Sequence, residues 1–157
     1  MRVSTMRQTL ALAAGAALLT GLCLPAHAGL GGDAASIETD RIQMKAQATA
    51  NAQAGFTVQE LTLPTGTVVR EYLSPQGQVF AVSWHGQEIP DLRQTLGGYY
   101  ATASAALNSA GPAPDHRHRS AQTPDIVVHI TARMRMHTGL VYVPALLPQG
   151  VSPSSLL

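Results

Sequence analysis

The sequence predicts an α+β fold: a single antiparallel sheet of five to six strands with helices packed on one face. The main observation is a turn sequence that occurs twice between Thr57 and Trp84, as Leu63-Pro64-Thr65-Gly66 and as Ser74-Pro75-Gln76-Gly77. Proline presets φ at the second turn position, and glycine accepts the left-handed conformation that closes a type I turn with a bulge. Because β-rich sequence flanks both turns, we expect a three-stranded meander. Helical and further β-rich segments give the order helix, three strands, helix, two or three strands.

Residues 1–28 are predicted to be a secretory signal peptide. Arg2 and Arg7 precede a small and apolar run from Leu10 to Leu24, and Ala26-His27-Ala28 follows. The apolar run is about 15 residues long, short of the roughly 20 that a spanning helix needs, so cleavage near Ala28 is favoured over a membrane anchor. The protein is therefore expected in the periplasm or outside the cell, with no membrane span after cleavage.

Residues 29–157 are expected to form a single small exported domain. Leu22 stands where lipoprotein processing requires a small residue, so we expect a product without a lipid anchor. Cys23 is the only cysteine and lies in the leader, so we expect neither a disulfide nor a thiolate metal site after cleavage. Two of the ten basic residues lie in the leader, which leaves eight basic against nine acidic residues. Such a chain lacks the basic cluster that nucleic-acid binding needs, so nucleic acid is not expected as a partner.

Two regions are predicted to be helical. The first runs from Ser36 to Ala54, because Ser36 can cap it, its body is rich in alanine, and Gly55 is placed to end it. The second starts at Pro90-Asp91 and consists of Leu92 to Leu96, a break at two glycines, and Tyr99 to Ser109.

The closing pairs of the two turns, Leu63 with Thr67 and Ser74 with Gln78, fix an expected register for the meander. One face then holds most of the large side chains and is assigned to the core; it carries Phe56, Val58, Glu60, Thr62, Val68, Arg70, Tyr72, Phe80, Val82 and Trp84. The opposite face carries Thr57, Gln59, Leu61, Val69, Glu71, Leu73, Val79, Ala81 and Ser83.

A candidate ligand site lies on the first of these faces. Arg70 falls opposite Glu60, where a structural ion pair is favoured over a ligand-binding arginine. If the aromatic face forms a pocket wall, the residues expected to contact a ligand are Arg70, Tyr72 and Trp84. Core packing explains the same aromatic residues without a ligand.

Residues 111–124 are predicted to be an exposed loop, since they include three prolines and no large apolar residue. The loop contains His116-Arg117-His118-Arg119. Alternating histidines can bind a metal, but a solvated basic segment is favoured because no third ligand is near and two arginines repel a cation.

The β pattern returns after Asp125. Strands are expected at Ile126 to Thr131, at Arg133 to Thr138 and at Leu140 to Val143. Met134 and Met136 share a face of the second strand, where core filling is favoured over a copper site, so neither a metal nor a cofactor is expected. The proline-containing residues 144–157 are expected to form an irregular tail on the surface.

Short sequence runs along nearly the whole of residues 29–157 resemble one family. They are Leu30-Gly31-Gly32, Val69-Arg70-Glu71-Tyr72, Phe80-Ala81-Val82-Ser83-Trp84, Pro90-Asp91-Leu92 with Leu96-Gly97, and Tyr142-Val143-Pro144-Ala145-Leu146-Leu147-Pro148. Together they resemble the small exported proteobacterial proteins catalogued as domain of unknown function 2844, whose members tend to have Gly-Pro where this chain has Gly86-Gln87. The resemblance implies export and a shared fold, and it implies no activity.

Three functions from different classes fit these observations. A non-catalytic envelope-associated binding or interaction module is favoured; it would dock another cell-envelope protein or a surface polymer, and the apolar segment Val141 to Leu147 could add to a partner. A small-ligand carrier would use the aromatic face around Trp84. A hydrolase is the least favoured, because its histidines (His85, His129, His137) and carboxylates (Glu71, Glu88, Asp91) form no recognised catalytic pattern; no catalytic residue is assigned.

Overall fold

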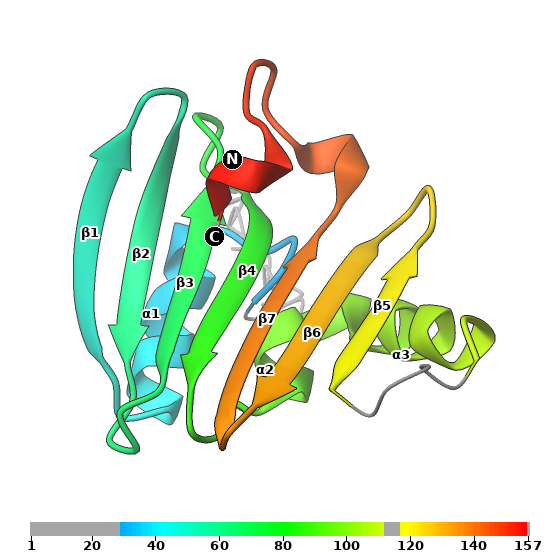
Figure 1. Ribbon diagram of the computed structural model, residues 1–157. Helices are drawn as coiled ribbons and strands as arrows, with labels where there is room; N and C mark the ends of the chain where they lie inside the picture. Colours follow the sequence, from blue (N-terminus) through cyan, green and yellow to red (C-terminus); the bar gives the residue numbers. More distant parts are fainter. Residues whose placement is uncertain (1–28, 112–116, 157) are drawn as a thin grey trace, which may run out of the picture.

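The computed structural model describes residues 29–111 and 117–156, which form one seven-stranded antiparallel sheet with helices behind it (Figure 1). The spatial order of the strands is β1-β2-β3-β4-β7-β6-β5. Their bounds are β1 Gln47–Gln53, β2 Phe56–Thr62, β3 Val68–Leu73, β4 Val79–Gly86, β5 His118–Gln122, β6 Val127–Arg133 and β7 Met136–Tyr142. The predicted α+β class and single antiparallel sheet are confirmed, whereas the predicted count of five to six strands is wrong.

The two faces of the sheet are covered differently. The helices α1 (Ala34–Gln43), α2 (Leu92–Leu96) and α3 (Tyr100–Ser109), with a 3-10 turn at Gly97–Tyr99, lie on one side, here called the helix face. The C-terminal segment, with 3-10 turns at Pro144–Leu146 and Pro153–Leu156, crosses one end of the other side, here called the tail face (Figure 1). The predicted signal peptide lies outside the described residues.

Helix α1 is much shorter than the predicted helix Ser36 to Ala54. It begins after Asp33, whose Oδ1 accepts a hydrogen bond from the backbone N–H of Ser36 at 2.9 Å. It ends at a left-handed Lys45 (φ 52°), around which Ala46 N–H donates to Arg41 O at 2.9 Å and Lys45 N–H donates to Ile42 O at 3.2 Å. These two bonds form a Schellman motif with lysine in the position where glycine is usual.

The alanine-rich residues after Lys45 form strand β1 instead of continuing the helix. All seven residues of β1 pair with β2, from Gln47 opposite Thr62 to Gln53 opposite Phe56. Backbone pairing along a full strand thus overrides the helix propensity of alanine. Gly55, predicted to end the helix, instead lies in the turn between β1 and β2.

The two Pro-x-Gly turns of the meander are confirmed. Leu63 N–H donates to Thr67 O at 2.8 Å in the first, and Ser74 N–H donates to Gln78 O at 2.9 Å in the second. Gly66 and Gly77 take left-handed φ values of 81° and 78°, as the turn geometry requires. The expected register of β2 with β3 follows, with Glu60 opposite Arg70.

The register of β3 with β4 departs from the prediction after a single pair. Leu73 lies opposite Val79, but Tyr72 lies opposite Ala81, so Phe80 is an extra residue on β4. Such a β-bulge shifts every later residue of the strand to the other face. Trp84, predicted to share a face with Tyr72, therefore lies on the helix face, and the face assignment of Val82, Ala81 and Ser83 is reversed with it.

Two further predictions in the C-terminal half are wrong. Residues 118–122, placed in an exposed loop, form the edge strand β5, which pairs with β6. The expected strand Arg133 to Thr138 is interrupted by a two-residue hairpin turn: Arg133 ends β6, Met136 begins β7, and Met134 and Arg135 between them both have positive φ, at 48° and 65°. The tail after Val143 turns onto the sheet, where Leu156 is fully buried.

The sheet consequently has a hydrophobic cluster on each face. The larger one, beneath the helices, includes Leu30, Ile37, Leu61, Val69, Leu73, Val79, Val82, Trp84, Leu96, Ala103, Ile126, Val128, Val141 and Val143. The smaller one, beneath the C-terminal segment, consists of Tyr72, Phe80, Ala81, Leu140 and Leu156, with Phe56, Val58 and Tyr142 packed against it. The C-terminal segment is thus part of the packed structure.

Gly139 provides a direct test of the packing on the helix face. A Cβ added there would overlap the indole ring of Trp84, which lies over β7 opposite Gly139. We expect Gly139→Ala to lower the free energy of unfolding by about 1–3 kcal/mol, the usual cost of overpacking a core. Urea denaturation measures this. The matched control is Gly98→Ala, because a Cβ at Gly98 meets no atom within 4 Å; equal effects of the two substitutions would contradict the placement of Trp84.

Candidate functional site

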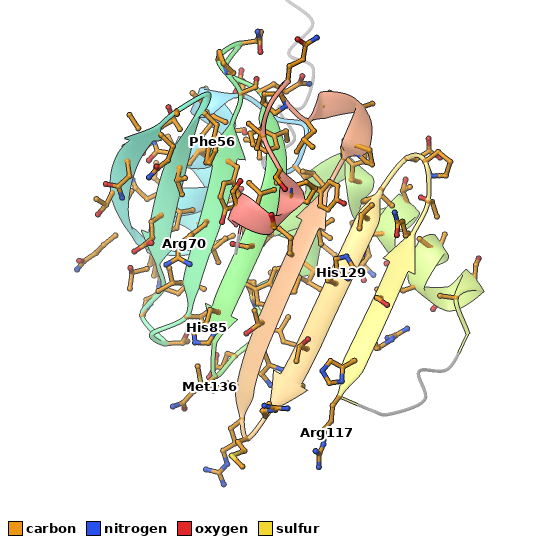
Figure 2. All side chains as sticks on the ribbon, turned by 45° about the horizontal axis from the view of Figure 1, so that its top comes forward. Phe56, Arg70, His85, Arg117, His129 and Met136 are labelled. Atoms are coloured by element: carbon orange, nitrogen blue, oxygen red, sulfur yellow. The ribbon has the colours of Figure 1, made fainter. Side chains whose placement is uncertain are left out.

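The tail face contains a groove of about 770 Å³ between β1, the meander and the C-terminal segment. Phe56, Val58 and Tyr72 form its floor, and the ion pair of Glu60 and Arg70 lies in its lining. One wall comes from the end of β1 and the other from the C-terminal segment; these walls consist of Asn51, Ala52, Gln53 and Ala54, and of Gly150, Val151, Ser152 and Ser155. Figure 2 shows Phe56 and Arg70 on the same side of the sheet.

The floor of the groove is an aromatic cluster held in place by the end of the chain. The ring centroids of Phe56 and Tyr72 are 6.0 Å apart, those of Phe56 and Phe80 are 6.0 Å apart, and those of Tyr72 and Phe80 are 6.2 Å apart. The Tyr72 hydroxyl donates to Leu156 O at 2.6 Å and shares a hydrogen bond of 3.0 Å with Ser83 Oγ. Burial raises the pKa of Tyr72, so its hydroxyl stays neutral and anchors the C-terminal segment.

The predicted pairing of Arg70 with Glu60 is confirmed. Arg70 Nε donates to Glu60 Oε2 at 2.8 Å, with 40 % of the arginine side chain and 32 % of the glutamate side chain exposed. A half-exposed pair of this kind adds little to stability. Its effect is to orient the guanidinium beside the groove, because only Nε is used in the bond to Glu60.

The three residues predicted to contact a ligand are not brought together. Arg70 and Tyr72 line the groove on the tail face, whereas Trp84 is only 1 % exposed and packs on the helix face. Sequence reasoning also missed the polar residues of the two walls, Asn51, Gln53, Ser152 and Ser155. They belong to the segments predicted as helix and as irregular tail, and no local pattern indicates that those segments meet.

Comparison with known proteins identifies the family. The model of the family described as "Protein of unknown function (DUF2844)" matches residues 26–156. The chain belongs to this family. No curated protein and no solved structure matches it. The DUF2844 match covers all seven strands and the C-terminal segment, so the groove and both hydrophobic clusters lie inside the family region.

Two side chains of the hydrolase hypothesis, those of His85 and Asp91, make other hydrogen bonds in this DUF2844 chain. His85 Nδ1 is hydrogen-bonded to Thr138 Oγ1 at 3.0 Å, and Asp91 caps α2 by accepting from Arg93 N–H at 2.9 Å. Glu71 is fully buried on the helix face, whereas His85 is exposed on the tail face. The structure therefore does not pair Glu71 with His85.

The apolar segment Val141 to Leu147 is not available to a partner as the sequence suggested. Val141 is fully buried within β7, the central partner of β4 and β6, and Val143 is 3 % exposed. Leu146 packs against both hydrophobic clusters.

Among residues 29–111 and 117–156, no three histidine, cysteine or acidic side chains gather closely enough to hold a metal ion. His116 of the histidine-arginine run lies outside that part of the chain, and His118 is in β5. None of the helices described in those ranges is both long and apolar enough to span a membrane.

A pair of buried carboxyl groups lies between the sheet and α1. Glu71 of β3 and Asp40 of α1 are both fully buried, and Gln94 Nε2 donates to Asp40 Oδ1 at 2.9 Å. Burial, followed by the neighbouring Asp40 carboxyl, raises the pKa of Glu71 to about 8; burial also raises the pKa of Asp40. At neutral pH the Glu71 carboxyl is therefore protonated and can donate a hydrogen bond to Asp40.

This pair makes stability dependent on pH. The pKa of Glu71 is higher in the folded state (about 8) than its ordinary value of 4.5, so the folded protein binds the extra proton between these values. The contribution of Glu71 to stability is therefore fully present below about pH 4.5 and is lost as the pH rises through 8. We expect a loss on the order of 2–4 kcal/mol across this range.

Glu71→Gln should flatten this dependence, because glutamine keeps a hydrogen-bond donor and carries no charge. Urea unfolding at a series of pH values measures it, with the exposed Glu88→Gln as the matched control. A wild-type protein whose stability does not fall between these pH values, or a Glu71→Gln variant that falls equally, would contradict the protonated pair.

Proposed function

We infer that this DUF2844 chain is an exported, non-catalytic binding module, and that its groove holds a segment of an acidic surface polysaccharide. The observation that carries this proposal is the composition of the groove: an oriented guanidinium, uncharged amide and hydroxyl groups, and an aromatic floor in one open channel. Export is supported by the predicted signal peptide at residues 1–28, and a surface polymer is a ligand that an exported protein meets.

Arg70 is suited to a carboxylate or sulfate group on the polymer. Arginine presents its donors in a planar fork that matches the two oxygens of a carboxylate. Since Glu60 accepts from Nε, the two terminal amino groups of Arg70 have no hydrogen bond to any described residue. Glu60 thereby fixes the arginine while its remaining donors stay available.

The walls of the groove match the other groups of a sugar. Asn51, Gln53, Ser152 and Ser155 are exposed and lie on opposite sides of the groove, where their amide and hydroxyl groups can donate to and accept from sugar hydroxyls. Phe56 is half-buried and its outer part can pack on the C–H face of a sugar ring. Polar and apolar contacts of this kind occur together in a carbohydrate.

An extended polymer fits the groove better than a small ligand does. Pockets for small molecules enclose about 70–90 % of the ligand surface. Here both walls include solvent-exposed residues, and the groove lies between a sheet edge and a surface segment. A carrier that uses Trp84 is not favoured because that ring lies under the helices.

The test is binding of purified protein to oligosaccharides of a uronic acid, measured by isothermal titration calorimetry against uncharged glucose oligosaccharides of equal length. We expect preference for the acidic series. Arg70→Gln should weaken binding by about tenfold or more, because hydrogen bonds to charged groups contribute roughly 1.5–3 kcal/mol. The matched control is Arg135→Gln, an exposed arginine in the β6–β7 turn.

Arg135→Gln should leave the affinity unchanged. Absence of binding to both series would overturn the proposal, as would an affinity that Arg70→Gln and Arg135→Gln reduce equally, since the second result would indicate nonspecific charge attraction.

A further inference from the structure

Strand β1 is an edge strand with an unusual lack of protection. All seven of its residues are exposed on both sides of the strand, and it lies at the end of the sheet with nothing beyond it in Figure 1. Natural proteins protect such edges with charged residues, proline, bulges or a covering segment, because free N–H and C=O groups pair with other strands. β1 contains no charged residue and no proline, and its register with β2 is unbroken.

The other edge of the sheet differs in these respects. Strand β5 is shorter, at five residues, and it contains Arg119 and His118. Helix α3 also contacts β5. The two edges of the sheet therefore differ in how well their free backbone N–H and C=O groups are protected. Of the two, β1 is the edge better suited to pair with another strand.

The sequence of β1 is nearly palindromic. It reads Gln47-Ala48-Thr49-Ala50-Asn51-Ala52-Gln53, so the strand and its reverse differ only by the exchange of Thr49 with Asn51. In an antiparallel pair of two such strands centred on Ala50, glutamine faces glutamine, alanine faces alanine, and Thr49 faces Asn51. Each residue meets a side chain of matching size and polarity, as a self-complementary two-fold interface requires.

We propose that β1 is a dimerisation edge, occupied by β1 of a second copy of this chain that pairs antiparallel about Ala50. The pairing with β2 places Ala48, Ala50 and Ala52 on the helix face and the four polar residues on the tail face. Across the interface the small alanines allow close approach on one face, and the amide and hydroxyl groups of Gln47, Thr49, Asn51 and Gln53 can bond on the other. No like charges meet.

The two-fold axis of this arrangement is perpendicular to the sheet. Two seven-stranded sheets would join into one continuous sheet, with the tail faces of both copies on the same side. Since Asn51 and Gln53 line the groove, the two grooves would flank the interface. This last consequence rests on the proposed function: two neighbouring grooves would bind one polymer with higher avidity than a single groove.

The test is the molar mass in solution, measured by sedimentation equilibrium over a wide concentration range on protein expressed from the full-length sequence. The wild type should rise toward twice the mass of one chain. Thr49→Lys with Asn51→Lys places like charges opposite each other and should remain at the mass of one chain. Thr49→Lys with Asn51→Glu places opposite charges in the same positions and should restore the dimer.

A wild-type protein that stays monomeric at every concentration would overturn the proposal, and so would a double-lysine variant that still dimerises. Failure of the lysine-glutamate variant alone would overturn the register about Ala50. Far-UV circular dichroism checks that each variant is folded, and Ala50→Lys, which should also be monomeric, gives an independent measurement. Because Ala50 lies on the face opposite the groove, monomeric Ala50→Lys should still bind a short acidic oligosaccharide. This variant therefore distinguishes a failure of the dimer proposal from a failure of the proposed function.

Discussion

One extra residue in β4 determines how the two faces of this protein are built. Phe80 has no partner of its own on β3, so both it and Ala81 contribute to the tail face, while Val79, Val82 and Trp84 contribute to the helix face. Without the bulge, Trp84 would lie on the tail face together with Tyr72 and Phe80, and the helix face would lack its indole ring. The bulge thereby supplies each side of one sheet with its own large aromatic residues. One cluster supports the helices, and the other supports the C-terminal segment and the floor of the groove.

The second cluster brings three of the few aromatic residues of the chain together, two lining the surface groove and the third, Phe80, buried beneath it. Phe56, Tyr72 and Phe80 come from three adjacent strands, and Leu156 packs on them from the far end of the sequence. The hydrogen bond from Tyr72 to Leu156 O fixes that segment as the wall of the groove. The sheet supplies the other wall at β1, so the groove exists only because distant parts of the chain fold against one strand pair. The buried Asp40–Glu71 pair lies on the opposite face and contributes to the attachment of α1.

What the sequence predicted correctly depends on local turn chemistry. Proline and glycine at fixed positions identify both meander turns, and these turns fix Glu60 opposite Arg70. The errors arise where residues other than glycine adopt left-handed conformations: Lys45 ends α1, and Met134 with Arg135 forms the β6–β7 turn. Their φ values are imposed by tertiary pairing, so no residue type marks them in advance. The bulge at Phe80 is likewise not marked by any residue type, because its one-residue shift follows from packing on both faces of the sheet. Arg70 and Tyr72 could therefore be placed at the groove from sequence, whereas Trp84 and the walls at Asn51 and Ser152 could not.

The most direct test of this account uses Trp84, the only tryptophan of the chain, as a reporter of the two-faced sheet. Its emission spectrum and its quenching by acrylamide are measured in the folded protein, with and without an acidic oligosaccharide. The account predicts emission shifted to shorter wavelength than that of free tryptophan, weak quenching, and no response to the oligosaccharide, since the indole lies beneath the helices and on the far side of the sheet from the groove. Emission and quenching like those of a solvent-exposed tryptophan would show that Trp84 lies on the tail face, and would contradict the bulge on which the rest of the structure depends.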